Sequence, residues 1–320
     1  MNFLNKTFFI TGGTGFIGKA LIKTLLSKGA KIYCYGRSKS KIENTFGKTV
    51  IPMTEFSMKG FEDKIDYIIH AACPTDFNLL NNFPSITIDK IYSLTKQSLD
   101  FANVQKARYL YLSSMEIYDG LDGYLTEDNV ASFNPSVPRN SYPIGKILSE
   151  LLVNSYHKEH ELNTAIVRLS NIFGPGCDKE SNKFFNYVIK QSLKNEDIVL
   201  KTTGNKIHNS CFINDAVNQI LLILNSDSNE TFNITNENYA LTINEICVFF
   251  NFNEICDKII KLSNSSSIVK HELEAGIYPK DSKHIISGQK IKNLFTIQQT
   301  DFENALQQTI NYFNQFLIFS

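Results

Sequence analysis

The stretch Thr11-Gly12-Gly13-Thr14-Gly15-Phe16-Ile17-Gly18 decides the fold of this 320-residue chain. It follows a short apolar run at residues 6–11 (KTFFIT) and opens a helical pattern with one apolar face at residues 16–28. Gly12 permits a tight turn, Gly15 lets backbone N–H groups approach a pyrophosphate, and Gly18 lets the helix pack closely on a sheet. The helix N-terminus favours the same anion. We therefore expect a dinucleotide at this turn, held by Gly12, Thr14, Gly15, Phe16, Ile17 and Gly18.

Strand-like and helix-like segments alternate from this turn onwards, which is typical of parallel strands joined by crossover helices. The expected strands are residues 6–11, 31–35, 49–53, 67–71, 108–113 and 164–169, and the expected helices are 16–28, 86–103, 142–160, 184–193, 215–224 and 302–316. Residues 119–141 are rich in Pro, Asn and Ser and are expected to form a loop. We predict an α/β fold in which residues 1–170 form a doubly wound parallel sheet that binds the dinucleotide. Residues 171–320 are expected to form a smaller mixed α/β substrate domain, with part of 205–225 returning to the first domain.

The composition excludes several classes of protein. Lys+Arg and Asp+Glu both number 32, so a general polyanion binder such as a nucleic-acid protein is not expected. No apolar run reaches the roughly 18 to 20 residues that a membrane span needs. The six cysteines contain no C-x-x-C pair and no zinc-ligand spacing, so we expect no metal site and mostly buried thiols in a reducing cytoplasm. The N-terminus has no signal-peptide pattern.

The end of the expected second strand bears on the choice of cofactor. A carboxylate at this position would bind the adenosine ribose and repel a 2′-phosphate. The chain has Tyr35-Gly36-Arg37-Ser38-Lys39 there, with no acid. Arg37, helped by Ser38, favours NADP over NAD, although a merely solvated basic loop explains the same residues nearly as well.

Tyr142 and Lys146 (YPIGK, residues 142–146) lie four residues apart on one expected helix face. A nearby ammonium favours the ionised phenol and lowers the pKa of a tyrosine from about 10, which suits acid–base chemistry near neutral pH. Ser114 follows the strand at 108–113, at the edge where open α/β sheets bind ligands. We expect its hydroxyl to hydrogen-bond a substrate oxygen beside the phenol. Each feature alone has a simpler explanation. The spacing of Tyr142 and Lys146 can arise by chance, and Ser114 can cap a turn.

Six segments in this order resemble the extended short-chain dehydrogenase/reductase family, in particular its nucleotide-sugar epimerase/dehydratase branch. They are TGGTGFIG (11–18), DYIIHAA (66–72), LSSMEIY (112–118), YPIGK (142–146), RLSNIFGPG (168–176) and FIND (212–215). The resemblance implies a Rossmann domain that binds NAD or NADP and a C-terminal part that holds a nucleotide-diphosphate sugar. It also implies cofactor contacts from Ala71 and Ala72 and assembly as a homodimer.

By motif position, the resemblance implies that Tyr142 is the base towards a sugar hydroxyl and that Lys146 holds the nicotinamide ribose. Ser114 would orient the substrate oxygen, and Asn171 matches an asparagine that contacts the diphosphate region. Loss of a hydride to the cofactor leaves a transient ketone, which acidifies the neighbouring C–H bond. Epimerisation, elimination and decarboxylation all become accessible from this ketone.

Glu116 occupies the position where dehydratases and decarboxylases of the family carry a glutamate, which makes it a candidate base at the carbon beside the ketone. A structural carboxylate is an equally good interpretation. Dehydratases place an aspartic acid immediately before it, and this chain has Met115, whose thioether donates no proton. This departure counts against dehydration and leaves epimerisation and decarboxylation.

A second departure concerns the diphosphate site, where family members commonly carry an arginine before the FIND segment. This chain has His208 there, and Lys183 lies further upstream. A neutral imidazole binds phosphate less well than a bidentate guanidinium. Either nearby lysines compensate or the substrate is unusual.

Three functions follow from these observations. The first is an NAD(P)-dependent enzyme that oxidises a nucleotide-diphosphate sugar and then epimerises or decarboxylates it. The second is an NADPH-dependent 4-ketoreductase of a keto-deoxy sugar nucleotide, favoured by Arg37 and disfavoured by Glu116. The third is a non-catalytic dinucleotide sensor, which Ser114, Tyr142 and Lys146 argue against.

Overall fold

The computed structural model describes residues 3–56, 63–178, 180–181, 183–194, 196–251, 269–271 and 283–317. Seven parallel strands form a central sheet in the order β11-β7-β5-β4-β1-β2-β3. These strands are β1 (Thr7–Thr11), β2 (Lys31–Tyr35), β3 (Ile51–Met53), β4 (Tyr67–His70), β5 (Arg108–Ser114), β7 (Thr164–Leu169) and β11 (Thr231–Ile234). The strand order reverses between β1 and β4, and ligands of such sheets bind at this switch point, beyond the carboxyl ends of the strands. The predicted doubly wound Rossmann fold is confirmed.

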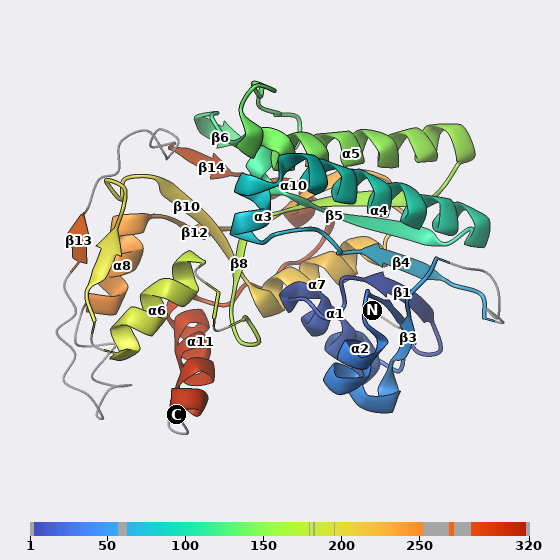
Figure 1. Ribbon diagram of the computed structural model, residues 1–320, viewed down its shortest axis with the longest axis horizontal. Helices are drawn as coiled ribbons and strands as arrows, with labels where there is room; N and C mark the ends of the chain where they lie inside the picture. Colours follow the sequence, from blue (N-terminus) through green and yellow to red (C-terminus); the bar gives the residue numbers. More distant parts are fainter. Residues whose placement is uncertain are drawn as a thin grey trace.

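Helices cover both faces of this sheet (Figure 1). Strand side chains alternate between the faces, so that Phe8 and Ile10 pack against α1 and α7 while Phe9 packs against α4. Because both faces are buried, the strands read as nearly continuous apolar runs. The helices of this half are α1 (Phe16–Ser27), α2 (Lys39–Phe46), α3 (Phe77–Asn82), α4 (Pro84–Gln105), α5 (Ser141–His160) and α7 (Ile213–Leu224), with short 3-10 turns η1 (Gly47–Thr49), η2 (Met115–Tyr118) and η3 (Pro138–Asn140).

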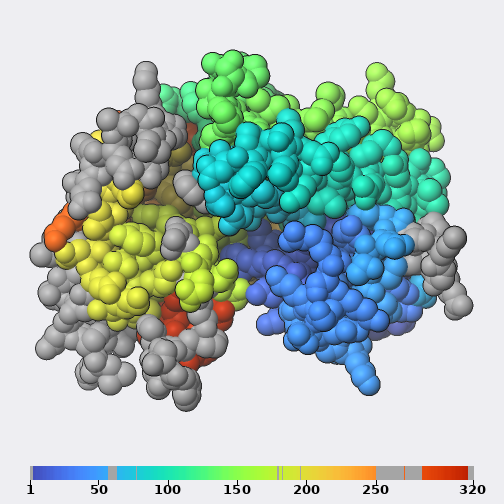
Figure 2. Space-filling view, in the orientation of Figure 1, coloured from blue at the N-terminus to red at the C-terminus, as the bar shows by residue number. Residues whose placement is uncertain are grey.

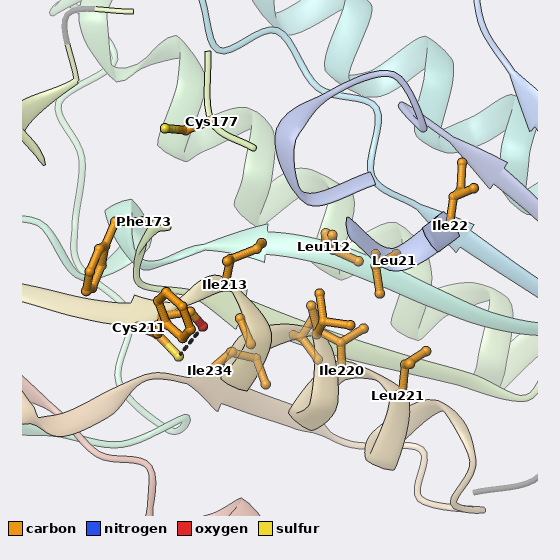
Figure 3. Packing of buried hydrophobic residues seen from close by; sticks show 14 of the residues in the cluster. Leu21, Ile22, Leu112, Phe173, Cys177, Cys211, Ile213, Ile220, Leu221 and Ile234 are labelled. Carbon is orange, nitrogen blue, oxygen red and sulfur yellow. Dashed lines mark hydrogen bonds between the residues drawn. The ribbon is translucent and has the colours of Figure 1, made fainter. Parts of the chain in front are cut away.

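The largest hydrophobic core continues from the sheet into the second half of the chain. Figure 3 shows Leu112 of the sheet near Leu21 of α1 and Ile220 of α7, with Ile234 and Phe173 further along the same layer. Phe173 stacks on Phe185 with ring centroids 4.2 Å apart. This shared core holds the two halves of the chain against each other. Figure 2 shows a hollow on the surface, where the blue and cyan residues of the first half meet the yellow residues of the second.

The second half contains smaller sheets and additional helices. A mixed sheet has the order β12-β10-β8, and two-stranded sheets pair β13 with β9 and β14 with β6. Its elements are β8 (Asn171–Phe173), α6 (Phe184–Lys194), β9 (Ile198–Leu200), β10 (Ile207–Phe212), β12 (Asn236–Thr242), α8 (Ile243–Asn251), β13 (Val269–His271), β14 (His284–Ile286), α10 (Gln289–Leu294) and α11 (Phe302–Leu317). The boundary at residue 170 stays a prediction; α7 and β11, both later in the chain, pack with the central sheet.

Two expectations about elements need correction. The segment 119–141, expected to be a loop, contains β6 (Gly123–Leu125) and η3, because β14, which lies far along the chain, supplies a partner for β6. The helix expected at 86–103 begins earlier, at Pro84, since proline is well suited to the first helical turn. Within the described ranges, no helix is long and apolar enough to cross a bilayer.

A buried ion pair joins α5 to the sheet. The Arg168 guanidinium at the end of β7 donates to both carboxylate oxygens of Glu150, with Nη2 2.8 Å from Oε2 and Nε 3.1 Å from Oε1. The Arg168 and Glu150 side chains are 5% and 9% exposed. Arg168 also donates to the Tyr118 hydroxyl at 2.9 Å, and Tyr118 donates to Asn233 of β11 at 2.7 Å. This network joins η2, α5, β7 and β11 close to the carboxyl edge of the sheet.

Replacing Arg168 by Met should lower the free energy of unfolding by about 3–5 kcal/mol, because Glu150 would remain as a buried carboxylate without a partner. Urea denaturation followed by circular dichroism measures this change. Lys39→Met is the matched control, since the Lys39–Glu43 pair is 66% and 49% exposed and should contribute less than about 1 kcal/mol. A Glu150→Leu/Arg168→Met double variant as unstable as Arg168→Met would contradict the explanation.

Candidate active site

The glycine turn between β1 and α1 has a backbone that only glycine accommodates. Gly12 has a φ of +71°, and a Cβ there would lie 2.7 Å from the backbone of Ala71 and Ala72. A Cβ on Gly18 would lie 2.3 Å from the Gly12 carbonyl oxygen. Gly15 is the N-cap of α1, so the first N–H groups of the helix face the turn. The turn therefore fits the pyrophosphate of a dinucleotide, because bare backbone and a helix N-terminus line it.

The end of β4 is attached to this turn by a buried histidine. The Thr11 hydroxyl lies 2.8 Å from His70 Nδ1 and accepts from the Ala72 N–H at 3.0 Å. His70 Nε2 lies 3.3 Å from the Thr95 hydroxyl of α4. Burial lowers the pKa of His70 to about 3, and the Lys146 ammonium acts in the same direction, so the imidazole stays neutral. His70 lies in the DYIIHAA segment and was not among the residues predicted for the site, yet its contacts position Ala71 and Ala72.

Arg37 and Ser38 lie after β2, at the start of α2. Arg37 is exposed. Ser38 is the N-cap of α2, and its hydroxyl accepts from the Lys41 N–H at 3.2 Å. A basic side chain and a helix N-terminus are thus available together at this position, and both favour an anion.

Ser114, Tyr142 and Lys146 meet at the carboxyl edge of the sheet. Ser114 is the last residue of β5, and the other two lie in the first turns of α5. The buried Lys146 ammonium donates to the Leu112 carbonyl at 2.7 Å and lies 5.8 Å from the Tyr142 ring centroid. It also lies 4.8 Å from the centroid of the Tyr111 ring. The ammonium therefore lies between β5 and the Tyr142 ring.

The charge state of this cluster differs in one respect from the expectation. Burial raises the pKa of the Tyr142 phenol above its usual value of 10, and the opposing effects of Lys146 and Ser114 do not cancel this rise. The lowered pKa predicted from the sequence is wrong, because the four-residue spacing reveals the ammonium and not the burial of the phenol. Burial disfavours the Lys146 ammonium, but Cys73, Tyr111 and Tyr142 raise its pKa above the usual value, so it stays charged.

Glu116 lies in η2, immediately after Ser114 and Met115, and its N–H donates to the Ser114 hydroxyl at 3.2 Å. Its carboxylate accepts from Arg139 Nη2 at 2.8 Å. Burial raises the pKa of Glu116, and Arg139 opposes this rise. The Arg139 guanidinium lies 5.9 Å from the Tyr142 ring centroid. Arg139 is absent from the site predicted from the sequence, although its position three residues before Tyr142 was the available signal.

The three residues expected at the diphosphate lie in different surroundings. Asn171 donates to the Asn209 carbonyl at 3.0 Å and to the Met115 sulfur at 3.4 Å, which places it beside η2. His208 packs against Phe184 and Phe185, at ring centroid distances of 4.9 Å and 5.4 Å. Burial, and to a smaller degree the charge of Lys206, lower the pKa of His208 to about 3, so it offers no positive charge at neutral pH. Lys183 is exposed beside the start of α6.

Among the described residues no group of three His, Cys, Asp or Glu side chains could hold a metal ion. The two histidines three residues apart on α5 have other partners. The His157 Nδ1 lies 2.8 Å from the Leu162 carbonyl, and His160 packs edge-on against Tyr156. The side chains that the structure places at the carboxyl edge of β5 are the Tyr142 phenol, the Lys146 ammonium, the Ser114 hydroxyl and the Glu116 carboxylate.

Comparison with known proteins agrees with this arrangement. The chain is 28% identical over 240 residues to UDP-glucuronic acid decarboxylase 6 of Arabidopsis thaliana, which covers 72% of this chain and 70% of the relative. It is 25% identical over 328 residues to the UDP-N-acetyl-alpha-D-glucosaminuronate decarboxylase of Bacillus cytotoxicus, covering 98% and 99%. The solved UDP-glucuronic acid 4-epimerase of Bacillus cereus, in complex with UDP-glucuronic acid and NAD, has a TM-score of 0.78 at 19% identity and covers 97% of this chain and 99% of its own.

The sequence model of the NAD dependent epimerase/dehydratase family matches residues 8–235, from β1 to the last residues of the central sheet. This range includes the glycine turn, Ser114, Tyr142 and Lys146, and the resemblance drawn from the sequence is confirmed. The relatives are nucleotide-sugar decarboxylases and a 4-epimerase, so the ketoreductase alternative is not favoured. The chain belongs to the NAD-dependent epimerase/dehydratase family and is an NAD(P)-dependent enzyme that modifies a nucleotide-diphosphate sugar.

Proposed function

We propose that this enzyme is a decarboxylase of a UDP-hexuronic acid, with the C4 hydroxyl of the sugar as the site of transient oxidation. The observation that carries the proposal is the cluster of Ser114, Tyr142 and Lys146 with Glu116 beside it and Met115 in place of a proton donor. An epimerisation at C4 needs no acid or base at C5, whereas decarboxylation needs a proton delivered there. The decarboxylase relatives support the same choice.

The proposed reaction begins at the C4 hydroxyl. Tyr142 must be ionised to accept the hydroxyl proton, a form that burial opposes and the Lys146 ammonium favours, while Ser114 holds the oxygen. NAD or NADP bound in the glycine turn would supply the hydride acceptor for C4. We assign contacts with the cofactor to Gly12, Thr14, Gly15, Phe16, Ile17, Gly18, Ala71, Ala72, Tyr142 and Lys146.

The C4 ketone makes the sugar a β-keto acid. The C5–C6 bond breaks, CO₂ leaves, and the electron pair moves to the C4 oxygen as an enolate. A proton is then added at C5, for which Glu116 is the proposed donor, and the ketone is reduced again as Tyr142 returns its proton. The net reaction consumes one proton and leaves the cofactor unchanged. Asn171 is proposed to contact the diphosphate, together with Lys183 and, as a neutral hydrogen-bonding group, His208.

The protein is expected to convert UDP-glucuronic acid labelled with ¹³C at C6 into labelled CO₂ and a UDP-pentose, with no net NADH or NADPH produced. Mass spectrometry of the nucleotide sugars measures this. Tyr142→Phe should lower turnover by about 10²- to 10⁴-fold, because the proton acceptor is lost, while cofactor binding persists. A product of unchanged mass would instead indicate epimerisation, and consumption of one NADPH per product would indicate a ketoreductase; either result contradicts the proposal.

We further propose that the cofactor is NADP in preference to NAD, because Arg37 and the N-terminus of α2 follow β2 where no carboxylate opposes a 2′-phosphate. Calorimetry should show that Arg37→Ala raises the Kd for NADP about tenfold and changes the Kd for NAD less than about twofold, since one charge-assisted contact is lost. Lys6→Ala, at the opposite edge of the sheet, is the control. Equal effects on both cofactors would contradict this reading.

The family implies a homodimer, and we propose α4 and α5 as its interface. Large apolar side chains are exposed on both helices, among them Tyr92 (42%), Val104 (63%) and Leu151 (63%). Sedimentation velocity at micromolar concentration should give a dimer, and Leu151→Lys should shift it towards monomer. A wild-type monomer would contradict the assignment.

We propose the cytoplasm as the compartment, because Cys34, Cys73, Cys211 and Cys247 are thiols; cell fractionation tests this.

A further inference from the structure

The chain contains four arginines, and the structure gives two of them structural roles. Arg168 is saturated by Glu150, the Tyr118 hydroxyl and backbone carbonyls. Arg108 begins β5, about 20 Å from the other end of that strand, and donates to the carbonyls of residues 223, 224 and 228. Arg37 lies after β2, three strands away from β5 across the sheet. Arg139 is thus the arginine that lies at the catalytic phenol.

Arg139 is held loosely compared with the two structural arginines. Its side chain is 38% exposed and that of Glu116 is 29% exposed. The structure records one hydrogen bond of its guanidinium within the described residues, from Nη2 to Glu116 Oε2 at 2.8 Å. A guanidinium carries five N–H donors in a planar fork, so most of the donors at this position are available to a ligand. Lys206, the other cation near Glu116, is paired with Asp119 at 3.6 Å.

We propose that Arg139 binds the carboxylate at C6 of a hexuronic acid substrate, and that this carboxylate takes the place of Glu116 on the guanidinium. This inference rests on the proposed function, because it names the residue that selects a carboxylated sugar over a neutral hexose. A carboxylate and a guanidinium form two parallel N–H···O bonds, which gives both affinity and orientation. The contact with the Tyr142 ring keeps the guanidinium beside the group that reacts at C4.

The exchange has a chemical consequence for Glu116. Arg139 now opposes the rise in the Glu116 pKa that burial causes. When Arg139 turns to the substrate, Glu116 loses this opposing charge and gains a second carboxylate as a neighbour, and both changes raise its pKa further. A protonated Glu116 is the form that can deliver a proton to C5. The same exchange therefore selects the substrate and prepares the proton donor.

Calorimetry with UDP-glucuronic acid and UDP-glucose tests the proposal, since the two ligands differ in the C6 carboxylate. Arg139→Met should weaken binding of UDP-glucuronic acid at least tenfold and of UDP-glucose less than about threefold, and Arg139→Lys should recover part of the loss. Lys6→Met, which removes an exposed ion pair at the opposite edge of the sheet, should change neither. Thermal denaturation and cofactor binding verify that each variant is folded.

A double-mutant cycle separates exchange from simple repulsion. Glu116→Gln should tighten binding of UDP-glucuronic acid, because Arg139 loses its competitor, and this gain should disappear in the Arg139→Met background. A gain that persists without Arg139, an equal loss for both ligands in Arg139→Met, or a wild-type protein that binds both ligands equally would overturn the proposal. A wild-type protein that prefers UDP-glucuronic acid through Arg139 and releases no CO₂ would reject the decarboxylase and support the role of Arg139.

Discussion

The contact between the Lys146 ammonium and the Leu112 carbonyl is the constraint on which the site depends. A buried ammonium needs hydrogen-bond partners, and the carbonyl of β5 supplies one at 2.7 Å. This contact fixes the start of α5 against the end of β5, which brings the Tyr142 phenol to Ser114. The ring of Tyr111 covers the same ammonium. One buried charge thus determines the position of the helix, the orientation of the phenol and the electrostatic support for its ionised form.

The buried pair of Arg168 and Glu150 is a second contact that holds α5 on the sheet. It joins the middle of α5 to β7, and Tyr118 extends the network to β11. Burying two charges stabilises a fold little in itself, because desolvation offsets the Coulomb attraction. The geometry of the Arg168–Glu150 pair matters more here than its contribution to stability, because a bidentate pair tolerates little displacement of α5. Catalytic groups that must be aligned within a fraction of an ångström benefit from such rigid support.

The fold and the chemistry are separable in this protein. The fold of this chain recurs in solved epimerases at under 20% identity. The fate of the ketone depends on a few side chains around η2. In the proposed mechanism Met115 offers no proton, Glu116 donates one at C5, and Arg139 sets the charge beside Glu116. Small differences in one turn therefore distinguish reactions that share a common first step.

The sequence by itself determined the sheet, the position of the glycine turn and the approach of Tyr142 to Ser114. These features depend on local periods: apolar runs define strands, a four-residue spacing defines a helix face, and parallel strands must end at one edge. The tertiary structure alone decided the pairing of Arg139 with Glu116, the neutral state of His208 among aromatic rings and the raised pKa of Tyr142. Each of these depends on burial and on partners far away in the chain, and neither quantity is encoded in the spacing of neighbouring residues.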